Sequence, residues 1–167
     1  MQKVKIRVEN NVSSLLQEGN HVVTIKGYKE TASKANAGYN DVTEQIAVSL
    51  ENAAGKFITM WLNTKGYKRF SQLTEKEVAS GKFGNSSDDE SVDGYAVDKK
   101  TGCRIEDEEK TASALSIIGK LAQDAGMAIG LELSLDELMD ELVGREVGIA
   151  VKGNKVAYTQ PAERVHA

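Results

Sequence analysis

The sequence is poor in the residues that build disulfides, metal centres and membrane spans. Its 167 residues include one cysteine, Cys103, which excludes an internal disulfide framework and any zinc site with several cysteine ligands. Two histidines, His21 and His166, leave little material for a histidine-rich metal centre or a catalytic triad. No run approaches the roughly 18 apolar residues of a membrane helix, and the N-terminal MQKVKIRVENN lacks the apolar region of a secretory signal. We therefore expect a protein of the reducing cytoplasm without a membrane partner.

The motifs of common catalytic and metal sites are also missing. No P-loop, GxSxG, HExxH or GxGxxG pattern occurs, and no Asp-x-Asp-x-Asp-Gly calcium loop is present. We therefore expect a protein that is not an enzyme and that uses no cofactor and no metal.

Charge is unevenly distributed along the chain. The formal net charge is −4, but residues 1–70 hold 10 Lys/Arg against 6 Asp/Glu, whereas residues 71–167 hold 11 against 19. Such an asymmetry indicates an anionic partner for the basic half, or an uneven surface charge without a partner.

Hydrophobic periodicity predicts a mainly β protein with appended helices. Alternating or β-branched stretches predict about six strands, at 3–8, 21–31, 42–50, 56–63, 146–151 and 155–159. Apolar residues at helical spacing predict helices over 110–126 and about 135–143. Ser134 and Glu137 predict a capping box at the start of the second helix. The order of three strands, a helix and further strands is that of an OB fold, a five-stranded, partly open barrel.

The middle of the chain differs in composition. Residues 71–109 hold clusters of Gly, Ser, Asp and Glu and few apolar residues to offset the entropy of ordering, so they predict an acidic, flexible insertion. Only 94–97 and 103–105 are candidates for short strands there, as a small hairpin. We predict a single OB-fold domain over 1–167 that carries this insertion, with a frayed tail at 161–167. The acidic run at 86–109 fits either a solvated loop or a protein-docking element.

Basic and aromatic residues are interleaved in the first half. Lys26-Gly27-Tyr28-Lys29 is echoed by Lys65-Gly66-Tyr67-Lys68, and Phe57 and Trp61 share one face of the strand at 56–63. Cations that follow phosphates and rings that stack on bases are what single-stranded nucleic acid needs from a protein. The alternative is that Phe57 and Trp61 are core residues and that the lysines form a solvated edge. The predicted phosphate contacts are Lys26, Lys29, Lys65, Lys68 and Arg69, and the stacking candidates are Tyr28, Tyr39, Phe57, Trp61, Tyr67 and Phe70.

The order of these motifs resembles a known family. The string GNHVVTIKGYKETASKANAGYNDVTEQIAVSLENAAGKFITMWLNTKGYKRF is similar to the first three OB strands of phage-encoded single-stranded DNA-binding proteins. ASALSIIGKLAQDAGM and the element that runs from Leu142 to Val151 resemble their helix and closing strand. The resemblance covers about 18–70 and 110–160. Many such proteins recruit replication partners through an acidic tail, whereas the acidic run here lies at 86–109.

The resemblance implies a sequence-independent, non-enzymatic protein that coats single-stranded DNA in phage DNA replication or recombination. Its partners would be single-stranded DNA and replication or recombination proteins, in the host cell cytoplasm. The sequence is compatible with a homo-oligomer and does not determine the oligomeric state. The alternative function is a protein-interaction module whose acidic segment docks a partner and which binds no nucleic acid.

Overall fold

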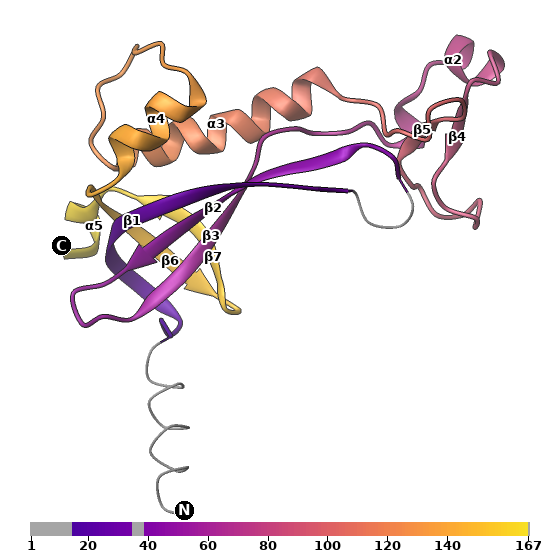
Figure 1. Ribbon diagram of the computed structural model, residues 1–167. Helices are drawn as coiled ribbons and strands as arrows, with labels where there is room; N and C mark the ends of the chain where they lie inside the picture. The colour runs from indigo at the N-terminus through magenta and orange to yellow at the C-terminus, as the bar shows by residue number, and fades with distance from the viewer. Residues whose placement is uncertain (1–14, 35–38, 167) are drawn as a thin grey trace, which may run out of the picture. The chain divides into compact units, whose positions relative to one another are not determined.

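The computed structural model describes residues 15–34 and 39–166 (Figure 1). The chain divides into two compact units, the first formed by residues 1–29, 47–62 and 117–167 and the second by 30–46 and 63–116. The prediction of one domain with a flexible insertion therefore differs from the structure, because residues 63–116 form a second unit together with 30–46.

One five-stranded sheet makes the protein mainly β, as the sequence predicts. Its order is β3-β2-β1-β6-β7, from β1 (Gly19–Lys34), β2 (Val42–Glu51), β3 (Phe57–Asn63), β6 (Glu146–Lys152) and β7 (Lys155–Gln160). Strand β6 runs antiparallel to β1, with Gly19 opposite Val151 and Thr24 opposite Glu146. Among the described residues the sheet is open, since β3 and β7 are its outer strands. The predicted strand at 3–8 lies outside the described residues.

Most of the core of the first unit lies on one face of this sheet. Strand β3 alternates as predicted, because Met60 and Leu62 are buried and Ile58 is half-buried, whereas Phe57 and Trp61 are 47% and 58% exposed. The buried apolar residues from the other strands of this unit are Val23, Ile25, Val48, Leu50, Val147, Ile149, Ala150 and Val151, so β6 is covered on both faces.

Two helices complete the core of the first unit. Helix α3 (Glu108–Asp124) buries Ile118, Leu121 and Ala122, and it ends before Gly126, whose φ of +87° suits a glycine at a helix C-terminus. Helix α4 (Leu135–Leu142) begins at the predicted capping box, in which Ser134 and Glu137 bond each other's backbone N–H groups. Both predicted helices are therefore confirmed.

A buried polar contact ties α3 to strand β7. The Thr159 hydroxyl donates to Asp124 Oδ2 at 2.7 Å, and Lys120 Nζ bonds both that carboxylate and the Thr159 carbonyl. Thr159 is only 4% exposed. Because a buried hydroxyl needs a partner, this contact fixes where the helix lies on the sheet.

The acidic segment is folded, which corrects the prediction of a partly disordered insertion. It contains a 3₁₀ turn η2 (Phe70–Gln72), α2 (Glu75–Ala79) and a two-stranded sheet of β4 (Phe83–Asn85) and β5 (Ala96–Asp98). Polar side chains replace the missing apolar ones. Asn85 Oδ1 accepts from the N–H groups of Ser87 and Gly94, and Asp93 accepts from both the N–H and the hydroxyl of Ser71. Side-chain bonds of this kind stabilise turns that composition alone does not predict.

Two chain boundaries also differ from the predictions. Strand β1 runs from Gly19 to Lys34, beyond both ends of the strand predicted at 21–31. The tail predicted to fray forms helix α5 (Ala162–His166). A Cβ on Gly148 would lie 2.7 Å from Val165 Cγ2, so glycine in β6 lets this helix approach the strand closely.

No helix in the described part of the chain is long and apolar enough to cross a membrane.

Candidate nucleic-acid interface

Three tyrosines and two arginines pack together in the second unit. The Arg104 guanidinium lies 3.9 Å from the centre of the Tyr67 ring, 5.0 Å from Tyr39 and 5.2 Å from Tyr95. Arg69 lies over the Tyr95 ring at 4.3 Å. The Tyr95 ring meets Tyr39 and Tyr67 edge-on, with centroids 6.0 and 6.3 Å apart. We call these five residues the tyrosine–arginine cluster; each of its cation–π contacts is of the order of 0.5–2 kcal/mol.

Backbone pairing brings the cluster's segments together. Isolated antiparallel bridges join Tyr67 to Glu106, Arg69 to Tyr95 and Val97 to Arg104. Because each pairing places cross-strand neighbours close together, Tyr67, Tyr95 and Arg104 meet although they are far apart in sequence. The hairpin predicted from 94–97 and 103–105 is therefore present as a single bridge, while β5 takes β4 as its strand partner.

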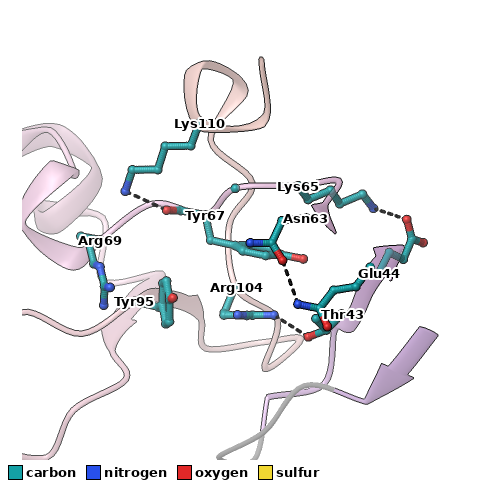
Figure 2. A pocket seen from close by; sticks show the side chains of 11 residues that line it. Thr43, Glu44, Asn63, Lys65, Tyr67, Arg69, Tyr95, Arg104 and Lys110 are labelled. Atoms are coloured by element: carbon teal, nitrogen blue, oxygen red, sulfur yellow. Dashed lines mark hydrogen bonds and ion pairs between the residues drawn. The ribbon is translucent and has the colours of Figure 1, made fainter. Parts of the chain in front are cut away.

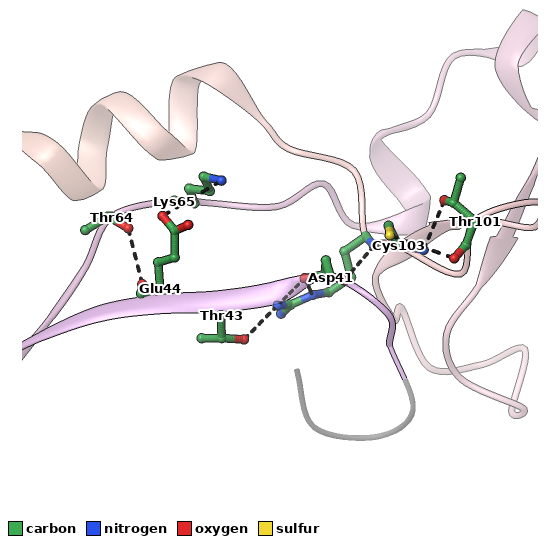
Figure 3. A network of polar contacts seen from close by, with 8 residues as sticks. Asp41, Thr43, Glu44, Thr64, Lys65, Thr101 and Cys103 are labelled. Carbon is green, nitrogen blue, oxygen red and sulfur yellow. Dashed lines mark hydrogen bonds and ion pairs between the residues drawn. The ribbon is translucent and has the colours of Figure 1, made fainter. Parts of the chain in front are cut away.

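Asp41 holds the Arg104 side chain in place. Its carboxylate accepts from Arg104 Nε at 3.0 Å and Nη2 at 2.8 Å, and from the Arg104 backbone N–H at 2.9 Å (Figure 3). The Arg104 and Asp41 side chains are 9% and 14% exposed.

The ionisation of the pair follows from this geometry. Burial alone would raise the pKa of Asp41, but the side-chain and backbone bonds from Arg104 outweigh it and hold that pKa below its ordinary value. Burial opposes the charge of Arg104 as well, yet the bonds to Asp41 raise its pKa. Both groups are therefore charged at neutral pH.

A pocket of about 390 Å³ opens beside the cluster, within the second unit (Figure 2). Four of its lining residues are cationic, namely Lys65, Arg69, Arg104 and Lys110, and one, Glu44, is acidic. The remaining lining residues are Thr43, Gln45, Asn63, Gly66, Tyr67 and Tyr95. A pocket with this surplus of positive charge attracts anions.

Lys110 is held at the rim of the pocket by neutral acceptors. Its ammonium donates to the Tyr67 carbonyl at 3.0 Å (Figure 2) and to Gln72 Oε1 at 2.7 Å. Gly66 makes this possible, because a Cβ there would lie 2.3 Å from Lys110 Cβ and 2.8 Å from the Lys110 carbonyl carbon. The start of α3 can therefore lie against the backbone at 66 only if that residue is glycine.

The Tyr67 hydroxyl stays protonated at neutral pH. Burial raises its pKa above the ordinary value of 10.0, although the nearby charge of Arg104 acts in the opposite direction. The pocket therefore presents a phenol that can donate a hydrogen bond to an anion.

The predicted site residues fall into two groups, one in each unit. Tyr39, Lys65, Tyr67 and Arg69 belong to the cluster or line the pocket, and Lys68 and Phe70 are half-buried in the same segment of the second unit. The others, Lys26, Tyr28, Lys29, Phe57 and Trp61, belong to the first unit.

In the first unit, the rings on β3 are more exposed than the tyrosine on β1. Phe57 and Trp61 project from the face of β3 opposite the buried residues, so the alternative that they are core residues is wrong. Tyr28 is half-buried, and its hydroxyl donates to Asp140 Oδ1 at 2.6 Å. Lys26 lines a pocket that it shares with Glu51 and Glu146, which makes its surroundings acidic.

Sequence reasoning missed Tyr95, Arg104 and Lys110. Tyr95 and Arg104 lie in the segment 71–109, where the surrounding acids outweigh their aromaticity and charge, and Lys110 is the first residue of the helix predicted over 110–126. One signal was available, since Arg104 is the only arginine between 71 and 110 and Tyr95 the only tyrosine.

Comparisons with known proteins do not identify the chain: no protein-family model matches it, and a search of curated proteins finds no significant match.

Proposed function

We propose that this protein binds single-stranded DNA without sequence preference and coats exposed strands. The observation that carries this proposal is the pair of large rings on β3. Trp61 and Phe57 are 58% and 47% exposed on the face opposite the core. A large ring costs free energy when it is left in water, so two on one strand face indicate a surface that binds something. Stacking on bases gives such rings about 1–3 kcal/mol each.

The sheet topology supports an OB fold. Strands β1, β2 and β3 follow one another in the sheet, and after a long connection β6 returns beside β1. This is a Greek key, and the OB fold is a five-stranded, partly open Greek-key barrel that binds oligonucleotides on the face of its second and third strands. Phe57 and Trp61 lie on the third strand of this sheet.

The cations that follow β3 in the chain suit phosphate contacts. Lys65 lies 4.0 Å from Glu44, and both side chains are about half exposed, so this ion pair is weak. Arg69 takes part in no ion pair among the residues that the structure describes. Both are therefore available to a polyanion. Lys26, Lys29 and Lys68 are proposed as further contacts, with Lys26 the weakest because Glu51 and Glu146 are nearby.

The biological setting follows from the resemblance of the sequence. We propose a role in phage DNA replication or recombination, in the host cytoplasm, with replication or recombination proteins as further partners. No catalysis, metal or cofactor is part of this function.

Fluorescence anisotropy of a labelled poly-dT strand tests the proposal. The strand should exceed roughly 16 nucleotides, the upper site size of one OB fold. We expect binding that weakens as salt rises, similar affinity for a mixed-sequence strand, and much weaker binding of duplex. A preference for duplex, or an affinity independent of salt, would contradict the proposal. Absence of any binding would favour a protein-interaction module instead.

A further inference from the structure

We propose that the pocket in the second unit holds one nucleotide unit, a base together with its phosphate. This inference rests on the proposed function and adds a second binding site to the exposed face of β3. It assigns a role to residues 71–109, which the sequence alone presents as an acidic insertion.

The size and walls of the pocket suit a nucleotide. Its volume of about 390 Å³ lies near the lower end of the roughly 300–1,000 Å³ of small-molecule sites. Tyr67 and Tyr95 contribute flat rings, and Arg104 lies parallel to and below the Tyr67 ring in Figure 2. Bases of single strands stack on tyrosine rings and on guanidinium planes alike. The pocket therefore offers a stacking surface of the required kind.

The phosphate would be held by cations that form no ion pair within the described part of the chain. An ammonium has three N–H donors, and Lys110 uses two of them on the neutral acceptors Tyr67 O and Gln72 Oε1. Arg69 stacks on Tyr95 and forms no ion pair among the described residues, although its charge and that of Lys110 both help to lower the pKa of the nearby Asp93 carboxylate. Arg104 differs, because Asp41 already occupies its guanidinium. Arg104 is therefore a positioning residue, and Lys110 and Arg69 are the phosphate ligands.

The edge of the base would meet two amide side chains. Gln45 Nε2 donates to Asn63 Oδ1 at 2.8 Å, and both residues line the pocket. This bond leaves the side-chain carbonyl oxygen of Gln45 as a hydrogen-bond acceptor and the side-chain NH₂ group of Asn63 as a donor. Every base has an adjacent donor and acceptor on its Watson–Crick edge, which single-stranded recognition uses. The pocket should therefore distinguish a nucleotide from phosphate alone, but not strongly one base from another.

The nucleotide unit has two sources, a residue within a strand or a free mononucleotide, and one set of titrations separates them. The full chain, labelled with ¹⁵N, is titrated with dTMP, thymidine, inorganic phosphate and poly-dT, while backbone amide shifts are followed in the second unit. We expect dTMP to shift the amides of Tyr95 and Lys110 at lower concentration than thymidine or phosphate does. If only poly-dT shifts them, the site takes its nucleotide from a strand, which also supports the pocket.

Variants then test which residues carry the binding. Lys110→Ala and Asn63→Ala should each weaken poly-dT binding by roughly 5- to 100-fold, the range of about 1–3 kcal/mol for one recognised base or phosphate. Lys76→Ala removes an exposed lysine of α2 in the same unit and should leave affinity unchanged. Circular dichroism and thermal melting confirm that each variant is folded.

The outcomes separate the two proposals. If poly-dT binds and Trp61→Ala weakens it, but Lys110→Ala and Asn63→Ala bind like the unmodified protein and the amides of the second unit do not shift, the nucleotide pocket is wrong and the proposed function stands. If neither poly-dT nor dTMP binds, both fail.

Discussion

Arg104 and Asp41 form three hydrogen bonds, and the same guanidinium lies 3.9 Å from the centre of the Tyr67 ring. One side chain therefore connects an ion pair to an aromatic cluster. Arginine suits this role because its planar guanidinium bonds a carboxylate through two N–H groups while its face lies on a ring. The relationship predicts that the Asp41 carboxylate stabilises the second unit although it does not line the pocket.

Asp41→Asn should destabilise the protein by about 2–3 kcal/mol, because hydrogen bonds to charged groups are worth about 1.5–3 kcal/mol and Arg104 keeps a largely buried charge. Urea unfolding followed by tyrosine fluorescence measures the change. Asp88→Asn is the matched control, since Asp88 is an exposed acid of the same unit whose side chain forms no hydrogen bond or ion pair among the described residues, and it should have little effect. Equal stability of the two variants would contradict the role given to the pair.

The same pair should make stability depend on pH. The folded pKa of Asp41 lies below its ordinary value of 3.8, so the unfolded chain binds a proton more readily than the folded protein does. The contribution is complete above that ordinary value and is lost as pH falls through the lower folded pKa.

Because Asp93 and other carboxylates also have lowered pKa values, the informative quantity is the difference between the unmodified protein and Asp41→Asn. We expect this difference in unfolding free energy to be constant near neutral pH and to shrink in acid. A difference that grows as the pH falls would contradict the assignment.

Two glycines give opposite predictions for the same substitution. Gly66→Ala places a Cβ 2.3 Å from Lys110 Cβ and 2.8 Å from a backbone carbon, so it should destabilise the protein by about 1–3 kcal/mol, the usual cost of overpacking. Gly119→Ala lies on an exposed turn of α3 with nothing within 4 Å. It should stabilise by about 0.5–1 kcal/mol because alanine restricts the unfolded chain more than glycine. Thermal melts of both variants test the pair of predictions.

Local patterns in the sequence predict most of the first unit. Alternation in 56–63 gives the correct faces of β3, Ser134 and Glu137 give the start of α4, and a two-residue turn between β6 and β7 follows from Lys152-Gly153-Asn154. Gly153 and Asn154 have φ of 57° and 65°, as a hairpin turn that favours glycine and asparagine requires. Each of these features is determined by residues that are close together in the sequence, so it can be predicted from one sequence alone.

The second unit could not be predicted in the same way. Its segments are held by turns and single bridges rather than by apolar stripes, and the bonds that join Asp41 to Arg104 span 63 positions. The motif at 65–70 supplies four of the eleven residues that line the pocket, whereas Tyr95 and Arg104 reach it only through pairing that no periodicity reveals. The composition of this segment predicts disorder because a sequence does not distinguish polar side chains that hydrogen-bond within turns from polar side chains that are exposed to water.

The salt dependence of binding should identify Arg69 as a phosphate contact. For single strands, log affinity falls with log salt at about 0.7 per phosphate neutralised. Arg69→Ala should therefore reduce the slope by about 0.7 and weaken binding at low salt. Lys26→Ala should change the slope less, because Glu51 and Glu146 line the same pocket as Lys26. Equal slopes for Arg69→Ala and the unmodified protein would remove Arg69 from the interface.

Trp61 and Met60 are neighbours on β3 with opposite surroundings. Trp61 is 58% exposed, whereas Met60 is 8% exposed and faces the core. Trp61→Ala should cost roughly 1–3 kcal/mol of binding to single-stranded DNA, the usual value for one stacked base, with little change in melting temperature. Met60→Ala should do the reverse, losing about 2–5 kcal/mol of folding stability while the folded fraction still binds normally.

Tryptophan fluorescence provides a direct readout, because Trp61 is the only tryptophan. Poly-dT should quench it in the unmodified protein and in Met60→Ala, since a base stacked on the indole brings the two π systems into contact. Trp61→Phe keeps a ring on the same face and should recover most of the affinity that Trp61→Ala loses. If DNA binds without quenching and Trp61→Ala binds as tightly as the unmodified protein, the exposed face of β3 is not the interface. The strand would then have to be held by the second unit, where the tyrosine–arginine cluster and its pocket provide the other rings and cations.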